Sequence, residues 1–163
     1  MKPVMLATDG SPTAEKATAT AIELARLLDT ELIIVSVWDL PHPAYSAMGF
    51  APVLTNEELA KLGEEEAGKV IAEAAARAEE ASVETRSVGL RGFPVQAICE
   101  AAERYRPQFL VIGSHGWGAV KRAIFGSVST GVLHHATCPV LVVPAEKTAS
   151  ESAKGSTRET INA

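Results

Sequence analysis

The sequence predicts an α/β fold in which a doubly wound, five-stranded parallel sheet carries helices on both faces. Short apolar runs alternate with segments of helical periodicity, an order that is typical of parallel sheets. Several of the runs are nearly continuous in Val, Ile and Leu, as expected of strands that are covered on both sides. The five expected strands are Val4–Ala7, Leu32–Val37, Val83–Val88, Phe109–Ile112 and Val140–Val143.

The first two helices are predicted to begin at capping residues. Ser11 can cap the first helix, and Pro12 suits its first position because proline lacks the N–H that would stay unpaired there. Thr55 starts the second helix, and Glu58 three residues later completes a capping box. The apolar stripe of this helix predicts that it continues to about Ser82.

The remaining elements complete the expected sheet. A third helix follows Pro94, and a fourth starts near Ser127 and ends before Thr137. The run Val83–Val88 is far more polar than the others, which favours a place at the sheet edge. We expect the strand order 3-2-1-4-5, a Rossmann-like winding in which the first and fourth strands are neighbours where the winding direction reverses.

Length and composition indicate one ordinary globular domain. The 163 residues are enough to bury a single core without covalent cross-links. A net charge of −5 argues against a general nucleic-acid surface, because such a surface requires clustered Lys and Arg. No apolar run approaches the roughly 18 residues of a membrane span.

The start of the chain and its two cysteines favour a cytoplasmic location. The sequence turns polar at Thr8, which is too early for a signal peptide. Cys99 and Cys138 form no CxxC pair, and we expect both to be buried, small apolar side chains in a reducing compartment.

Two segments fall outside the alternation of strands and helices. The loop from Asp39 to Leu54 is long for a connection between a strand and a helix, and it could be a lid, a partner surface or a variable surface loop. Residues 145–163 are polar and are expected to be disordered. The predicted globular domain therefore covers residues 1–144.

A glycine-rich stretch after the fourth strand could hold an anion. Glycines let the backbone approach a bulky anion, because they carry no side chain and tolerate positive φ. A helix that begins at Ser127 would direct unpaired N–H groups and the positive end of its dipole at that anion. Asp9, at the end of the first strand, would face this stretch, where a carboxylate suits ribose hydroxyls or a phosphate-bound Mg²⁺. The alternative is that Asp9 only supports a strand-to-helix turn.

The glycine spacing excludes two common nucleotide-binding patterns and matches a third. A P-loop needs a lysine after its last glycine, and the dinucleotide fingerprint follows the first strand. The stretch here is Gly113-x2-Gly116-x9-Gly126-Ser127. It matches every defined position of G-x2-G-x9-G-[ST], and it therefore resembles the ATP-binding signature of the universal stress protein family.

The resemblance covers about residues 2–144 and implies a ligand and its contacts. It includes the turn Asp9-Gly10-Ser11, Gly92-x-Pro94 and the segment 137–144. Family members with the intact signature bind ATP, so the resemblance implies ATP with Mg²⁺, which Asp9 would meet. Adenine would lie near Val37, the ribose by Asp9, and the phosphates against the backbone and two serine hydroxyls. The residues expected at the ligand are Ala7, Thr8, Asp9, Val37, Ile112, Gly113, His115, Gly116, Gly126, Ser127, Val128 and Ser129. His115 would either touch a phosphate or point into solvent.

The sequence offers no clear catalytic base or nucleophile. His134 and His135 are consecutive on a helix, so their side chains diverge, and Cys99 lies among apolar neighbours. Efficient phosphoryl transfer needs a group that orients water or a hydroxyl. The resemblance therefore favours a stress-response regulatory protein whose ATP-loaded state is read by partners. The alternatives are a slow ATPase or autophosphorylating enzyme, and a binder of AMP or another adenosine nucleotide.

The last strand predicts the oligomeric state. Val140–Val143 is apolar, and if it lies at a sheet edge its unpaired backbone needs a partner. Pairing with a second copy across a two-fold axis would supply that partner. The family resemblance also implies a homodimer.

Overall fold

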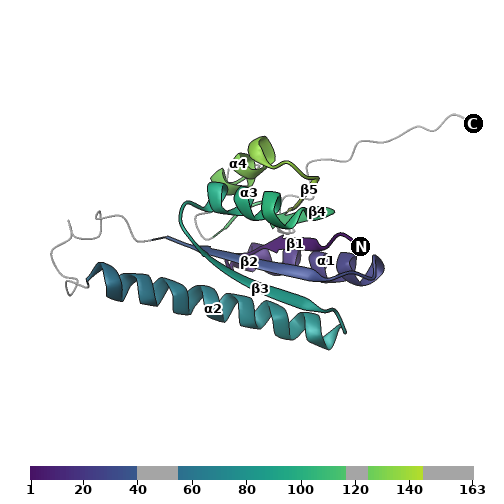
Figure 1. Cartoon of the computed structure of the whole chain (residues 1–163), viewed down its shortest axis with the longest axis horizontal. Coiled ribbons are helices and arrows are strands. Elements are labelled where there is room, and N and C mark those ends of the chain that lie inside the picture. Colours follow the sequence, from purple (N-terminus) through teal and green to yellow (C-terminus); the bar gives the residue numbers. More distant parts are fainter. Residues whose placement is uncertain (40–54, 117–124, 145–163) are drawn as a thin grey trace, which may run out of the picture.

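A parallel sheet of five strands forms the centre of the molecule. The computed structural model describes residues 1–39, 55–116 and 125–144. The strand order β3-β2-β1-β4-β5 confirms the predicted order, and every pairing is parallel (Figure 1). The elements are β1 (Val4–Ala7), α1 (Pro12–Leu27), β2 (Leu32–Trp38), α2 (Asn56–Glu80), β3 (Thr85–Arg91), α3 (Pro94–Tyr105), β4 (Phe109–Gly113), α4 (Ser127–His135) and β5 (Val140–Val143).

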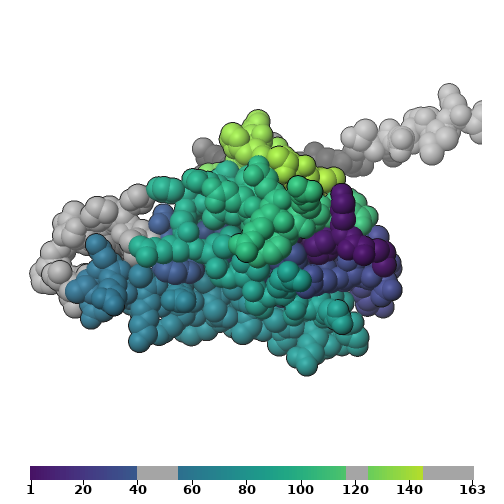
Figure 2. Space-filling view, viewed as in Figure 1, coloured from purple at the N-terminus to yellow at the C-terminus, as the bar shows by residue number. Residues whose placement is uncertain are grey.

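The helices divide into two layers because alternate strand residues face opposite sides of the sheet. Val4 and Leu6 of β1 join the core beneath α1 and α2. Met5 and Ala7 of the same strand join a second core beneath α3 and α4. Figure 2 shows this order on the surface, with α2 along one side of the molecule and α4 on the other. The doubly wound fold expected from the sequence is therefore confirmed.

The predicted helix starts are also confirmed. Pro12 is the first residue of α1, and the Ser11 side chain accepts a hydrogen bond from the Ala14 N–H at 3.3 Å. At the start of α2, the Glu58 carboxylate accepts from the Thr55 N–H at 2.7 Å, and Thr55 Oγ1 accepts from the Glu58 N–H at 3.2 Å. These are the two reciprocal bonds of a capping box.

The junction between α2 and β3 differs from the prediction. Helix α2 ends at Glu80 rather than near Ser82, and β3 begins at Thr85 rather than at Val83. Ser82 takes a left-handed φ of 58°, and the Val83 N–H donates to the Ala78 carbonyl at 2.9 Å. This bond closes the helix end as a Schellman motif, in which the following apolar residue packs back on the helix. Val83 is buried because it packs back on the helix that it closes, and this contact explains an apolar residue outside the strand.

Both edge strands are the predicted ones, while the length of one inner strand differs from the prediction. β3 lies at one edge, as its polarity predicted, and β5 lies at the other. β2 is one residue longer than expected and reaches Trp38. The expected long loop beyond Asp39 and the expected disordered tail at 145–163 lie outside the described residues. Among the helices that the structure describes, none is long and apolar enough to cross a membrane.

Candidate functional site

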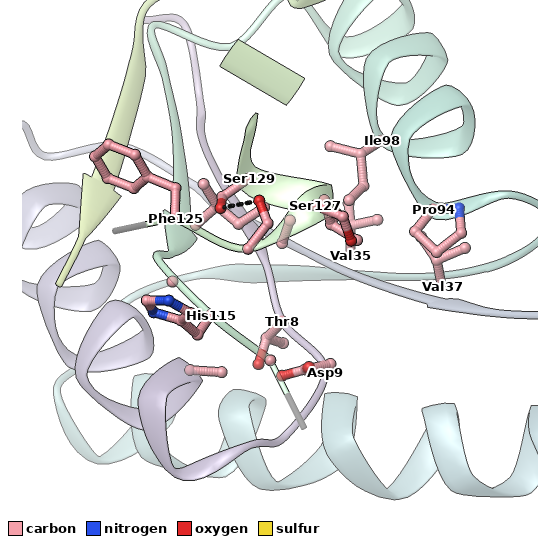
Figure 3. A pocket seen from close by; sticks show the side chains of 17 residues that line it. Thr8, Asp9, Val35, Val37, Pro94, Ile98, His115, Phe125, Ser127 and Ser129 are labelled. Atoms are coloured by element: carbon pink, nitrogen blue, oxygen red, sulfur yellow. Dashed lines mark hydrogen bonds between the residues drawn. The ribbon is translucent and has the colours of Figure 1, made fainter. Parts of the chain in front are cut away.

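A cavity of about 430 Å³ opens at the carboxyl ends of β1, β2 and β4, where the winding direction reverses (Figure 3). This edge is where open α/β sheets bind ligands. The cavity is lined by Ala7, Thr8, Asp9, Ala14, Val35, Val37, Pro94, Ile98, Ile112, Gly113, His115, Gly116, Phe125, Gly126, Ser127, Val128 and Ser129. All twelve residues that the sequence placed at a ligand are in this set, so the fold brings them together.

Five lining residues were not predicted from the sequence, and most of them extend the apolar wall. Val35 precedes Val37 by two residues and so shares its face of β2, a signal that the alternation of the strand could have given. Pro94 and Ile98 lie one turn apart on α3 and close the same end of the cavity (Figure 3). Their place depends on how α3 packs on the sheet. Ala14 and Phe125 complete the set.

The loop between β4 and α4 is tied together through the Ser114 carbonyl. This carbonyl accepts the Gly126 N–H at 2.6 Å and the Ser129 hydroxyl at 2.9 Å. The same hydroxyl lies 3.0 Å from the Gly126 carbonyl, and Ser129 is only 2% exposed. A hydroxyl has one proton to donate. The Ser129 hydroxyl thus holds the loop, and of the two serines only Ser127 has an exposed side chain at the cavity.

Close approach, and not positive φ, explains the glycines of the loop. Positive φ among the described glycines occurs only at Gly10 and Gly92, so Gly113, Gly116 and Gly126 do not use the left-handed conformation that glycine tolerates. A Cβ on Gly126 would lie 3.3 Å from the Ser114 carbonyl oxygen. A Cβ on Gly116 would overlap Asp9 Oδ2.

Asp9 supports the turn and also faces the cavity, so its position is compatible with both roles that the sequence left open. Its Oδ1 accepts the Ser11 N–H at 3.0 Å and so supports the turn into α1. Its Oδ2 lies against Gly116 across the cavity mouth, and the residue is exposed. A carboxylate that faces the loop can accept hydrogen bonds from ligand hydroxyls or bind a hard cation.

The amino end of α4 directs partial positive charge toward the cavity. Gly126 is the N-cap and supplies no side-chain hydrogen bond to the first turn. The first amides of a helix have no partner within the helix, and the helix dipole adds roughly half a positive charge there. Ser127 and Val128 present this end to the cavity.

The cysteines and the remaining histidines show no catalytic arrangement. Cys99 and Cys138 are free thiols, and both are half-buried rather than fully buried as expected. Partial burial raises the pKa of each thiol, which keeps the sulfur protonated and weakly nucleophilic. His134 and His135 are exposed at the end of α4. Within the described ranges, no three His, Cys, Asp or Glu side chains gather around a possible metal position.

A family model and a known relative both match this chain over most of its length. The model of the universal stress protein family matches residues 1–144. A universal stress protein of Thermus aquaticus is 36% identical over 146 residues, which cover 87% of this chain and 98% of the relative.

Two solved structures carry the same fold. The structure of the hypothetical protein MJ0577 aligns with a TM-score of 0.75 and 28% identity over 90% of this chain and 98% of its own. A universal stress protein in complex with cAMP aligns with a TM-score of 0.64 and 27% identity over 87% of this chain and 96% of its own. The second of these structures contains cAMP, which is an adenosine nucleotide.

Proposed function

We propose a function for this chain, which belongs to the universal stress protein family. We infer that it is an ATP-binding regulatory protein whose loaded state is read by a partner during the response to stress. The observation that carries this proposal is the cavity itself, because every defined position of the signature Gly113-x2-Gly116-x9-Gly126-Ser127 lies on it, opposite Asp9.

The two ends of the cavity suit the two ends of ATP. Adenine occupies the apolar end, between Val37 and the start of α3 at Pro94. The ribose lies by Asp9, whose carboxylate accepts its hydroxyls. The phosphates lie at the amino end of α4, where unpaired amides and the dipole favour negative charge. Ser127 adds one exposed hydroxyl there.

Mg²⁺ is proposed to bind together with ATP. A carboxylate oxygen is a ligand that Mg²⁺ prefers, and Asp9 provides one beside the loop. The phosphates and water molecules would supply the other ligands, as is usual for Mg²⁺ bound with a nucleotide. Bound Mg²⁺ neutralises part of the phosphate charge.

Binding is favoured over catalysis. The ionisable side chains on the described cavity wall are those of Asp9 and His115. Asp9 Oδ1 already accepts the Ser11 N–H, and His115 Nδ1 lies 3.0 Å from Ser114 Oγ. Because the proposal assigns the Asp9 carboxylate to the ribose and Mg²⁺, the described cavity wall has no second carboxylate to orient water, and we expect single-turnover ATP hydrolysis slower than about 1 s⁻¹, the low end of ordinary enzymes. A faster rate at micromolar protein would favour the ATPase or autokinase alternative.

The bound ligand can be identified without assuming its nature. The purified full-length chain is denatured by heat, and the released small molecules are identified by mass spectrometry. We expect ATP. Recovery of cAMP or AMP instead would favour the second candidate, a sensor of another adenosine nucleotide, which the similar cAMP-bound structure supports.

We also propose that the chain forms a homodimer through β5. This strand is a sheet edge with an unpaired backbone, and Leu141 on it is 38% exposed, so a second copy could pair with the backbone and cover the leucine. Leu141→Lys is expected to convert the dimer to a monomer in sedimentation experiments. Leu62→Lys on α2, where the leucine is 52% exposed, is the matched control and should remain dimeric. A monomeric wild-type protein would overturn the proposal.

A further inference from the structure

A directed chain of hydrogen bonds links helix α1 to the glycine loop. Thr13 Oγ1 donates to the His115 carbonyl at 2.6 Å, across 102 positions of sequence. The Thr13 hydroxyl has only one proton, so in its 3.1 Å contact with Ser11 Oγ the Ser11 hydroxyl must be the donor. Ser11 Oγ in turn accepts the Ala14 N–H. The chain therefore runs in one direction, from the first turn of α1 to the loop, and successive bonds in such a chain strengthen one another.

The backbone of α1 touches the same loop at a second point. A Cβ on Gly113 would lie 3.3 Å from the His115 carbonyl oxygen and 3.4 Å from the Thr13 carbonyl oxygen. The loop and the first turn of α1 are thus packed closely enough that a Cβ at position 113 would contact the backbone of both. Packing and hydrogen bonding independently place the loop against Thr13.

The bond from Thr13 also determines which way the next amide points. The peptide between His115 and Gly116 is planar and trans, so its carbonyl and its N–H point in opposite directions. With the His115 carbonyl directed at α1, the Gly116 N–H is directed away from α1. The apolar wall of the cavity, formed by residues such as Val37 and Ile98, belongs to that opposite side of the sheet, where α3 and α4 pack.

We propose that Thr13 is a positioning residue for the phosphate end of the bound nucleotide, although it does not line the cavity and is not part of the glycine signature. By holding the His115 carbonyl, it keeps the Gly116 amide turned toward the ligand before the ligand arrives. Preorganised donors bind an anion without the cost of ordering the loop at that moment. This inference rests on the proposed function.

The test compares ATP with adenosine, which lacks the phosphates. Thr13→Val removes the hydroxyl and keeps the shape of the side chain, and the affinity of the full-length chain for each ligand is measured by calorimetry. We expect Thr13→Val to weaken ATP about tenfold, as expected for one or two charged hydrogen bonds, and to change adenosine affinity less than about twofold. Thr13→Ser, which restores the donor, should return ATP affinity to within about threefold of wild type.

Three further variants separate positioning from general stability. Thr20→Val and Thr18→Val remove hydroxyls on the same helix that donate within α1, to Lys16 and Ala14, at 2.9 Å each. Both should bind ATP like wild type. If Thr13→Val does not fold, Thr13→Ala removes the same hydroxyl without placing a methyl group in the oxygen's position, and it should show the same selective loss of ATP affinity.

The outcomes distinguish this inference from the function on which it rests. Wild-type ATP affinity in Thr13→Val, or an equal loss of ATP and adenosine affinity, would overturn the positioning role alone. If the wild-type chain binds neither ligand, the proposed function is wrong and the positioning role falls with it.

Discussion

Replacing Gly126 by valine is expected to abolish detectable ATP binding, with an affinity loss of about 100-fold or more. A Cβ at this position would lie 3.3 Å from the Ser114 carbonyl oxygen, a tight contact with backbone, and 3.5 Å from the His115 Cα. The two additional methyl groups of valine must displace the loop or enter the cavity. Displacing the loop would break the 2.6 Å bond from the Gly126 N–H to the Ser114 carbonyl, and methyl groups in the cavity would occupy the space of the phosphates. Calorimetric titration with ATP measures the effect.

The control for this prediction is Gly68→Val on α2. A Cβ on Gly68 would meet no atom within 4 Å, and the residue is remote from the signature. This variant should bind ATP like wild type. Gly126→Val with an affinity within about threefold of the Gly68→Val control would mean that the loop does not contact the ligand.

Gly116→Ala is expected to weaken ATP binding by about 10- to 100-fold, the range for losing hydrogen bonds to a charged group. The new Cβ would overlap Asp9 Oδ2, which is the end of a flexible and exposed side chain. The carboxylate must rotate away, which weakens the 3.0 Å bond that its Oδ1 accepts from the Ser11 N–H, so we expect a small decrease in the thermal midpoint. Affinity falls because the displaced carboxylate no longer meets the ribose or Mg²⁺.

A double-mutant cycle with Asp9→Ala tests that explanation. If Gly116→Ala acts by moving Asp9, it should cost little affinity once Asp9 is already absent, and the two effects should be strongly non-additive. Asp9→Ala alone should resemble Gly116→Ala alone. Additive losses would show that residue 116 affects the ligand directly and that its contact with Asp9 is incidental.

The fold could be predicted from the sequence because most of its signals are local. The capping residues Ser11 and Thr55 with its partner Glu58 define helix starts within four residues of sequence. The apolar runs define buried strands in the same way, and the handedness of parallel crossovers then leaves few possible strand orders. The strand start was wrongly predicted at Val83 because a valine that closes a helix cannot be distinguished, from the sequence alone, from a valine that begins a strand.

The site was predicted less completely, because its remaining features depend on distant contacts. The glycine spacing identified the loop, but the reason for each glycine lies in its neighbours, such as Asp9 beside Gly116. The engagement of the Ser129 hydroxyl by a carbonyl fifteen residues away leaves no trace in the sequence. Thr13 meets His115 only because α1 packs beside β4, and no local pattern indicates that contact.

The proposed binding mode predicts how affinity depends on the number of phosphates. Calorimetry of the full-length wild-type chain with ATP, ADP, AMP and adenosine, in one buffer containing Mg²⁺, measures that dependence. We expect ATP to bind most tightly and the affinity to fall as phosphates are removed, with adenosine at least about tenfold weaker than ATP because it cannot use the amino end of α4. Equal affinity for all four ligands, or no binding of ATP, would contradict the placement of phosphate at Gly126 and Ser127.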